Sequence, residues 1–216
     1  MMETKRMQEI LEKSHYQTFD FLEGDRKDSN SGEKYRLSKL DAFDLNNLSC
    51  LDVGCNAGYF LFRMLQKNPR RLVGIDIGEK FIDVANTLNR EVFGSNIITF
   101  ICRDFFRYYF GEKFDMVICF SSFHYFGDNQ EVFFELCYGL MNKQGILLLE
   151  VEEYPFNDIS IVNRDVRPAD KKRYHYPNNL KLREFMFDKF NIIDRYISIK
   201  QGGSLYDRYF YVLQKV

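Results

Sequence analysis

The chain has 216 residues, 45% of them hydrophobic and 17% aromatic, and this composition excludes an intrinsically disordered protein. The formal net charge is −1, so no overall field recruits a nucleic acid or a membrane, and electrostatic recognition has to be local. The sequence contains no uncharged run of membrane-spanning length and no apolar secretory segment behind Met1. We therefore expect a cytoplasmic protein with no membrane partner.

The predicted elements alternate between strands and helices along most of the chain. Helices are expected near residues 3–14 and 33–43, before the first strand. The strands that follow are 49–53, 71–76, 97–102, 114–120 and 145–151. The helices between them are 58–67, 79–92 and 129–141, and a short aromatic segment covers 105–110. This alternation predicts an α/β fold with a parallel sheet and helices on both faces.

The tail departs from this alternation. A helix is expected over 179–189, followed by strands 191–200 and 206–214. Two successive strands with no helix between them form an antiparallel hairpin. The predicted sheet is therefore mostly parallel with an antiparallel C-terminal hairpin.

The five cysteines favour a reducing compartment. Their number is odd, none belongs to a C-x-x-C pair, and four lie in apolar surroundings typical of small buried side chains. The sequence therefore predicts neither a disulfide framework nor a zinc site.

The turn after the first strand is the most informative part of the chain. It reads D-x-G-x-x-x-G from Asp52 through Gly54 to Gly58 and joins an apolar strand to a helix. Glycines adopt backbone angles that a Cβ forbids and let a ligand approach the backbone closely. The unpaired N–H groups at the start of the following helix suit a polar or anionic ligand. The turn therefore predicts a site for a nucleotide-like molecule.

The second strand narrows the class of ligand. It begins at Arg71 and ends in Asp76, with Ile77 behind it. In doubly wound α/β sheets, an acid at the tip of the second strand accepts hydrogen bonds from ribose hydroxyls. A glycine-rich turn, a helix and a strand ending in an acid, in this order, form a more specific signal than the turn alone.

This order of motifs resembles the class I S-adenosylmethionine-dependent methyltransferases, whose first motif reads D-x-G-x-G-x-G. Asn56 stands in place of the middle glycine, and asparagine is the non-glycine residue that best adopts a left-handed conformation. A nicotinamide-dinucleotide site fits less well, because the turn lacks G-x-G-x-x-G. The resemblance spans about residues 48–151. It implies a Rossmann-like, seven-stranded sheet.

The resemblance also implies the cofactor, S-adenosyl-L-methionine (SAM), and its product, S-adenosyl-L-homocysteine (SAH). In the family, an acid after the third strand accepts the adenine amino group and the next residue packs on the base, and Asp104 and Phe105 match this pattern. A turn capped by Asp104 is the structural alternative. The expected cofactor-binding residues are Asp52, Gly54, Cys55, Asn56, Gly58, Asp76, Ile77, Asp104, Phe105 and Phe120.

The segment after the fourth strand is where we expect the chemistry. The carboxyl ends of parallel strands line the ligand crevice, and His124 closely follows the strand that ends in Phe120. A neutral imidazole accepts a proton from a hydroxyl or amine, so His124 is the candidate general base and Tyr125 a candidate substrate contact. A structural role for His124 is the alternative. No run of acids and histidines matches the metal-dependent relatives, so no metal is expected.

The fifth strand runs into three acids, Glu150, Glu152 and Glu153. They are open to two interpretations, a site that binds a cation or orients a donor group, or solvated charges at the rim of the sheet. The excursion at about 155–178 that follows is basic and aromatic, and it lies where such enzymes keep substrate-selecting elements. It suits a phosphate, a sugar phosphate or an RNA strand as well as a solvated loop. The candidate substrate contacts there are Arg173, Tyr174 and His175.

The N-terminal segment shows a second resemblance, to relatives of wobble-uridine-modifying tRNA methyltransferases, a group that also contains enzymes acting on small molecules and glycans. It is carried by His15–Asp20, a polar loop with Gly32, and Lys34–Arg36. In that group the segment closes over the cofactor, which makes Tyr16 and Arg36 the candidate lid residues. An amphipathic helix packed on the sheet explains the apolar positions equally well.

The expected organisation is an N-terminal helical lid over residues 1–47 and a SAM-binding methyltransferase domain over 48–216, with the insertion at 155–178. Methyl transfer to an oxygen of a small-molecule or glycan acceptor is the main hypothesis, because a His124 base suits an oxygen nucleophile. An RNA methyltransferase that uses the basic region 164–183 is the alternative. A non-catalytic SAM-binding regulatory protein is a further alternative.

Overall fold

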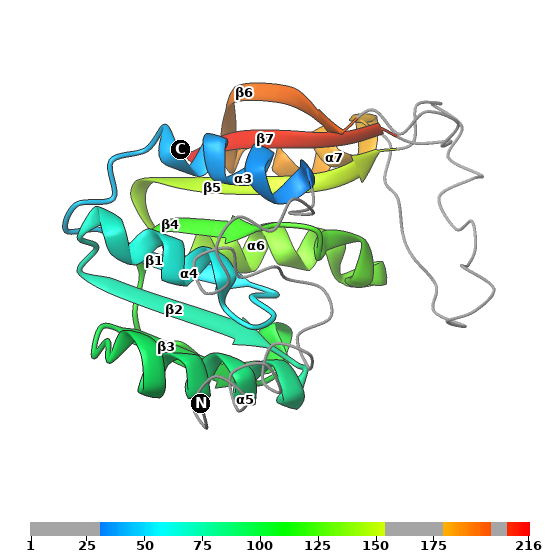
Figure 1. Cartoon of the computed structure of the whole chain (residues 1–216). Coiled ribbons are helices and arrows are strands. Elements are labelled where there is room, and N and C mark those ends of the chain that lie inside the picture. Colours follow the sequence, from blue (N-terminus) through cyan, green and yellow to red (C-terminus); the bar gives the residue numbers. More distant parts are fainter. Residues whose placement is uncertain (1–30, 154–178, 200–206) are drawn as a thin grey trace. The chain divides into compact units, whose positions relative to one another are not determined.

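The computed structural model describes residues 31–153, 179–199 and 207–216. Its strands form one sheet in the order β3 (Ile98–Cys102), β2 (Arg71–Asp76), β1 (Ser49–Val53), β4 (Phe114–Cys119), β5 (Met141–Glu153), β7 (Asp207–Lys215) and β6 (Phe190–Ile199) (Figure 1). The predicted seven-stranded, Rossmann-like sheet is confirmed. The helix expected near residues 3–14 lies outside the described residues. No described helix combines the length and the apolar character needed to cross a membrane.

The chain divides into two compact units, Met1–Tyr108 and Tyr109–Val216. In the first unit, β1 and β3 both pair in parallel with β2, which brings the carboxyl ends of the three strands to one edge. The helices and helical turns of this unit are α3 (Ser31–Asp41), α4 (Tyr59–Met64), η1 (Leu65–Lys67), α5 (Glu79–Leu88), η2 (Asn89–Phe93) and η3 (Phe105–Arg107).

Aromatic packing holds the first helix after the glycine turn. Phe62 of α4 stacks on Phe93 with ring centroids 4.3 Å apart, and its ring centroid lies 5.5 Å from that of Phe100 in β3. Every residue of β1 is buried, including the polar Ser49 and Asp52, as expected of a strand in the interior of a parallel sheet. Packed aromatic rings and a fully buried strand therefore support the turn.

The second unit contains the antiparallel part of the sheet. β5 runs parallel to β4, whereas β7 runs antiparallel to both β5 and β6, which confirms the predicted C-terminal hairpin. Three mutually packed rings of Phe123, Phe133 and Phe134 form the centre of its aromatic core. The helices and helical turns of this unit are η4 (Phe123–Tyr125), η5 (Gly127–Asn129), α6 (Gln130–Leu140) and α7 (Asn179–Met186).

β5 is longer than the strand that the sequence predicts. It begins at Met141 rather than at residue 145, and Gln144 within it has a left-handed backbone with φ of 59°. Its register with β4 shifts between Phe114 and Met116. Such an irregular start carries no regular alternation of side chains, which is the signal from which a strand is predicted.

Candidate functional site

The glycine turn has the backbone conformation that the motif requires. Gly54, Asn56 and Gly58 all have positive φ, at 77°, 50° and 83°. The prediction that Asn56 replaces a glycine without loss of the turn is therefore confirmed. The backbone N–H groups of Gly54 and Cys55 both donate to the carbonyl oxygen of Ile75, at 2.9 and 3.1 Å, and tie the turn to β2.

Asp76 clamps this turn from the tip of β2. Its Oδ2 accepts a hydrogen bond from the backbone N–H of Asn56 at 2.9 Å, and its Oδ1 accepts one from that of Gly78 at 2.8 Å. The Asn56 side chain contributes a further bond, since its Oδ1 accepts from the N–H of Ala57 at 2.7 Å. Ile77, the next residue, is 76% exposed and presents an apolar surface beside the carboxylate.

Asp52 is a buried carboxylic acid at the start of the turn. Its side chain is buried, and its Oδ2 has no hydrogen-bond partner among the described residues. Burial raises the pKa of Asp52 well above its ordinary value, and the negative charge of Asp76 raises it further. A buried acceptor without a donor is costly, so this oxygen fits a ligand that brings a donor or a positive charge.

Cys55, in the same turn, is buried. Burial raises the pKa of its thiol well above the ordinary value, and the charges of Asp52 and Asp76 raise it further. Because the thiolate is the reactive form, we expect Cys55 to resist alkylation in the folded protein while the partly exposed Cys102 reacts first. Peptide mass spectrometry after timed labelling measures this order. Equal labelling rates would contradict a closed turn.

Asp104 and Phe105 occupy the end of β3. Oδ1 of Asp104 accepts from the N–H of Phe106 at 3.0 Å, and Oδ2 lies 3.5 Å from Nε of Arg107. Phe105 is buried, with its ring edge-on to that of Phe106. The capped turn expected as the structural alternative is therefore present. Contact with adenine stays a prediction for both residues.

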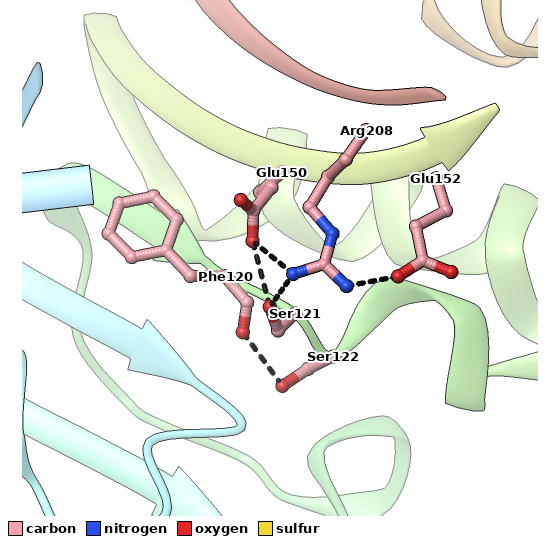
Figure 2. Close-up of polar contacts among 6 residues, drawn as sticks. All are labelled: Phe120, Ser121, Ser122, Glu150, Glu152 and Arg208. Atoms are coloured by element: carbon pink, nitrogen blue, oxygen red, sulfur yellow. Dashed lines mark hydrogen bonds and ion pairs between the residues drawn. The ribbon is translucent and has the colours of Figure 1, made fainter. Parts of the chain in front are cut away.

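In the second unit, Figure 2 shows a charged network around Ser121, two residues after the end of β4. Ser121 has a left-handed backbone with φ of 53°, a conformation that costs a non-glycine residue energy. Its Oγ donates to Oε2 of Glu150 at 2.8 Å and accepts from Nη1 of Arg208 at 3.1 Å (Figure 2). The other end of the guanidinium pairs with Glu152.

The interpretation of the three acids as solvated rim charges is wrong. Glu150, Glu152 and Glu153 are all buried. The physical reason is the antiparallel pairing of β7 with β5, which places Arg208 directly opposite Glu152. Arg208 and Ser121 were not predicted as site residues. A charged residue at the start of an otherwise apolar strand was the available signal for Arg208, but its partner depends on the register.

The buried Glu153 forms a second ion pair, with the half-buried Arg195. It accepts hydrogen bonds from the Arg195 guanidinium, at 2.8 Å for Nη2, and from the hydroxyl of Tyr211. Burial raises the pKa of Glu153, and the bonds from Arg195 and Tyr211 oppose that rise. Burial also raises the pKa of Tyr211, and Glu153 raises it further. The Arg195 guanidinium also lies 3.6 Å from the ring centre of Tyr209. These contacts join β5, β6 and β7 at the point where the chain leaves β5.

The predicted base, His124, and its neighbour Tyr125 follow Ser121 in the chain, and Phe120 precedes it. His124 is buried in η4, and its ring centroid lies 4.2 Å from that of Tyr125, which is 53% exposed. Phe120 is buried, and its ring centroid is 5.3 Å from that of Phe210 in β7. The roles assigned to these residues stay predictions.

Of the predicted lid residues, Arg36 lies within the described part of the chain. It is buried in α3, where Leu37 and Leu40 are also buried, so packing of the helix explains the apolar positions of this segment. Within the described ranges, no three His, Cys, Asp or Glu side chains are grouped as a metal ion requires. The predicted lid and substrate residues that lie outside the described residues are Tyr16, Arg173, Tyr174 and His175.

A glycine turn clamped by an acid at the tip of the second strand, on a sheet of this strand order, is the nucleotide-binding arrangement of doubly wound α/β proteins. The family model described as "Methyltransferase domain" matches residues 44–167, more than half of the chain. The chain belongs to this family. The predicted resemblance to class I SAM-dependent methyltransferases is confirmed.

The relatives with curated names include tRNA U34 carboxymethyltransferases. The one from Campylobacter jejuni subsp. jejuni serotype O:6 is 29% identical over 120 residues, which cover 54% of this chain and 40% of the relative. The one from Sulfurimonas denitrificans is 31% identical over 120 residues, covering 56% of this chain and 40% of the relative. The match therefore spans less than half of the length of each relative.

Solved structures share the fold at low sequence identity. Magnesium protoporphyrin IX methyltransferase from Synechocystis PCC 6803, with bound SAM, has a TM-score of 0.63 at 20% identity, over 86% of this chain and 78% of that chain. The N-methyltransferase NodS from Bradyrhizobium japonicum WM9, in complex with SAH, has a TM-score of 0.68 at 17% identity, over 97% of both chains. These similarities establish the fold.

Proposed function

We propose that this chain is a SAM-dependent methyltransferase that acts on RNA. The observation that carries the cofactor part is the clamped turn, in which Asp76 holds the N–H groups of Asn56 and Gly78 while the buried Oδ2 of Asp52 finds no donor in the described part of the chain. The observation that carries the RNA part is the similarity to relatives named for tRNA.

The residues of the first unit fit the chemical groups of SAM. Its α-ammonium would supply the donor and positive charge that Asp52 lacks. Asp76 would accept from ribose hydroxyls in addition to the bonds it already accepts. The exposed Ile77 offers an apolar surface to the adenine, with Asp104 and Phe105 as its expected polar and ring contacts. When bound, SAM supplies an activated methyl group on a sulfonium.

The raised pKa of Asp52 makes a testable prediction about binding. A protonated carboxyl does not attract an ammonium group, so affinity for SAH should rise as pH increases through the pKa of Asp52. Calorimetry over a pH series that stays below the titration of a free α-amino group, near about 8, measures this dependence. In Asp52→Asn the rise should disappear, leaving weak binding at every pH. A rise of equal size in that variant would contradict the assignment.

Two hypotheses differ in the molecule that accepts the transferred group. The sequence alone favoured an oxygen of a small molecule or a glycan, but the named relatives support the RNA alternative better. Their name describes transfer of a carboxymethyl group to tRNA U34, so the group that this chain transfers is part of the question. His124 is the proposed base for a hydroxyl or imino nucleophile.

The experiment is incubation of the purified chain with unmodified tRNA and SAM carrying an isotopic label in its methyl group. We expect label in the RNA and formation of SAH, both lost in Asp76→Ala and strongly reduced in His124→Gln. Label in a small-molecule or glycan pool but none in RNA would overturn the RNA assignment. Binding of SAM without transfer to any acceptor would favour the regulatory alternative.

A further inference from the structure

A basic and aromatic segment lies at the carboxyl end of β3 and includes, besides the expected cofactor contacts Asp104 and Phe105, exposed residues on both sides of them. Arg107 has a side chain that is 87% exposed, and Tyr109 is 88% exposed. Arg103 is also exposed, and Tyr108 is 37% exposed. We call residues 103–109 the Arg103–Tyr109 segment.

The backbone of the segment is anchored by a buried side chain and by hydrogen bonds. Phe105 is buried, and the carboxylate of Asp104 caps the helical turn by accepting from the N–H of Phe106. The backbone N–H of Arg103 donates to the carbonyl oxygen of Asp76 at 3.0 Å, which ties the segment to the tip of β2. Because the backbone is already anchored, binding through its exposed basic and aromatic side chains costs little conformational entropy.

The side chains of the segment suit a single nucleic acid strand. An exposed tyrosine ring is a surface on which an unpaired base stacks. A guanidinium has five N–H donors and pairs with phosphate oxygens through two of them. In Arg103, Nη1 donates to the carbonyl oxygen of Cys102 at 2.7 Å, which fixes the position of the group and uses one donor.

The distribution of charge favours a local contact between the segment and the phosphates of a nucleic acid. The whole chain carries a net charge of −1, so it has no overall attraction for a polyanion. Within the segment two arginines face one acid, and Asp104 is already bonded to the backbone and paired with Arg107. The local balance is positive where the aromatic rings are exposed.

We propose that the Arg103–Tyr109 segment binds single-stranded RNA, with a base stacked on Tyr109 and a phosphate held by Arg103. The inference rests on the RNA part of the proposed function and specifies the surface that contacts the strand. It predicts a preference for unpaired over duplex RNA, since only an unpaired base exposes its face.

The test is fluorescence anisotropy with a labelled oligouridylate of about 12 nucleotides at two salt concentrations. Tyr109→Ala should weaken binding about tenfold without changing the salt dependence, and Tyr109→Phe should retain it. Arg103→Ala should weaken binding and lower the salt slope by about one. Arg90→Ala removes another exposed guanidinium, on η2 and outside the segment, and should leave RNA binding unchanged. Arg107 is left intact because it pairs with Asp104.

SAM binding to each variant, measured by calorimetry, separates the two proposals. Wild-type affinity for SAM together with weakened RNA binding supports the segment. RNA binding that is unchanged in both Tyr109→Ala and Arg103→Ala overturns it. A wild-type chain that binds SAM but no RNA overturns the segment and the RNA acceptor while leaving the cofactor assignment. A wild-type chain that binds no SAM overturns the proposed function itself, whatever the RNA result.

Discussion

Replacing Gly58 with alanine should lower the free energy of unfolding by about 2–5 kcal/mol and abolish SAM binding. Gly58 has φ of +83°, where a side chain costs about 1–2 kcal/mol. In addition, a Cβ at this position would lie 2.5 and 2.6 Å from two ring atoms of Phe100. That ring also packs against Phe62, so it has little room to move without disturbing the core.

Gly94→Ala is the matched control for this experiment. Gly94 also has a left-handed backbone, with φ of +59°, but an added Cβ would meet no heavy atom within 4 Å. Its cost should be the conformational part alone, about 1–2 kcal/mol. Denaturant unfolding of both variants separates strain from collision. If Gly58→Ala lowers the free energy of unfolding no more than Gly94→Ala does, the Phe100 ring moves aside at little cost, and the predicted collision is wrong.

Replacing Arg208 with methionine should cost about 3–5 kcal/mol of stability, because two buried carboxylates lose their counter-charge. Its side chain is 15% exposed, and those of Glu150 and Glu152 are 1% and 10% exposed. Ser121 would also lose the hydrogen bond that its hydroxyl accepts from Arg208 in the left-handed turn. Denaturant unfolding at neutral pH measures the loss.

Two further variants decide whether charge is the cause. Arg90→Met breaks a pair whose arginine side chain is 63% exposed and should cost less than about 1 kcal/mol. Adding Glu150→Gln and Glu152→Gln to Arg208→Met should recover most of the lost stability, since neutral amides are cheaper to bury than carboxylates. If the triple variant is as unstable as Arg208→Met, lost packing rather than unpaired charge explains the effect.

Most elements could be predicted from the sequence because their signals are local. β1 and β2 begin and end at the predicted residues, since each is a short apolar run beside a turn. The conformation of the glycine turn could also be predicted, because glycine and asparagine are the residues that most readily adopt the positive φ observed at Gly54, Asn56 and Gly58. The start of β5 was misplaced because its left-handed Gln144 interrupts the regular pattern.

The polar contacts could not be predicted in the same way, because they depend on register. Arg208 meets Glu152 only once β7 has paired with β5, 56 positions apart in sequence. Burial of the three acids follows from that pairing and reverses the solvated-rim interpretation. Likewise, the sequence placed a carboxylate at the tip of β2, but the bond from Asn56 to Asp76 required the folded turn.

The cofactor assignment is tested by a calorimetric titration of SAM and SAH into the wild type and Asp76→Ala. The wild type should bind both, and the substitution should weaken binding at least about 100-fold, because hydrogen bonds to a charged group contribute about 1.5–3 kcal/mol each. Asp83→Ala, an exposed carboxylate on α5, should bind as the wild type does. Thermal unfolding of each variant separates lost binding from lost fold. No binding by the wild type, or full binding by a folded Asp76→Ala, would contradict the account.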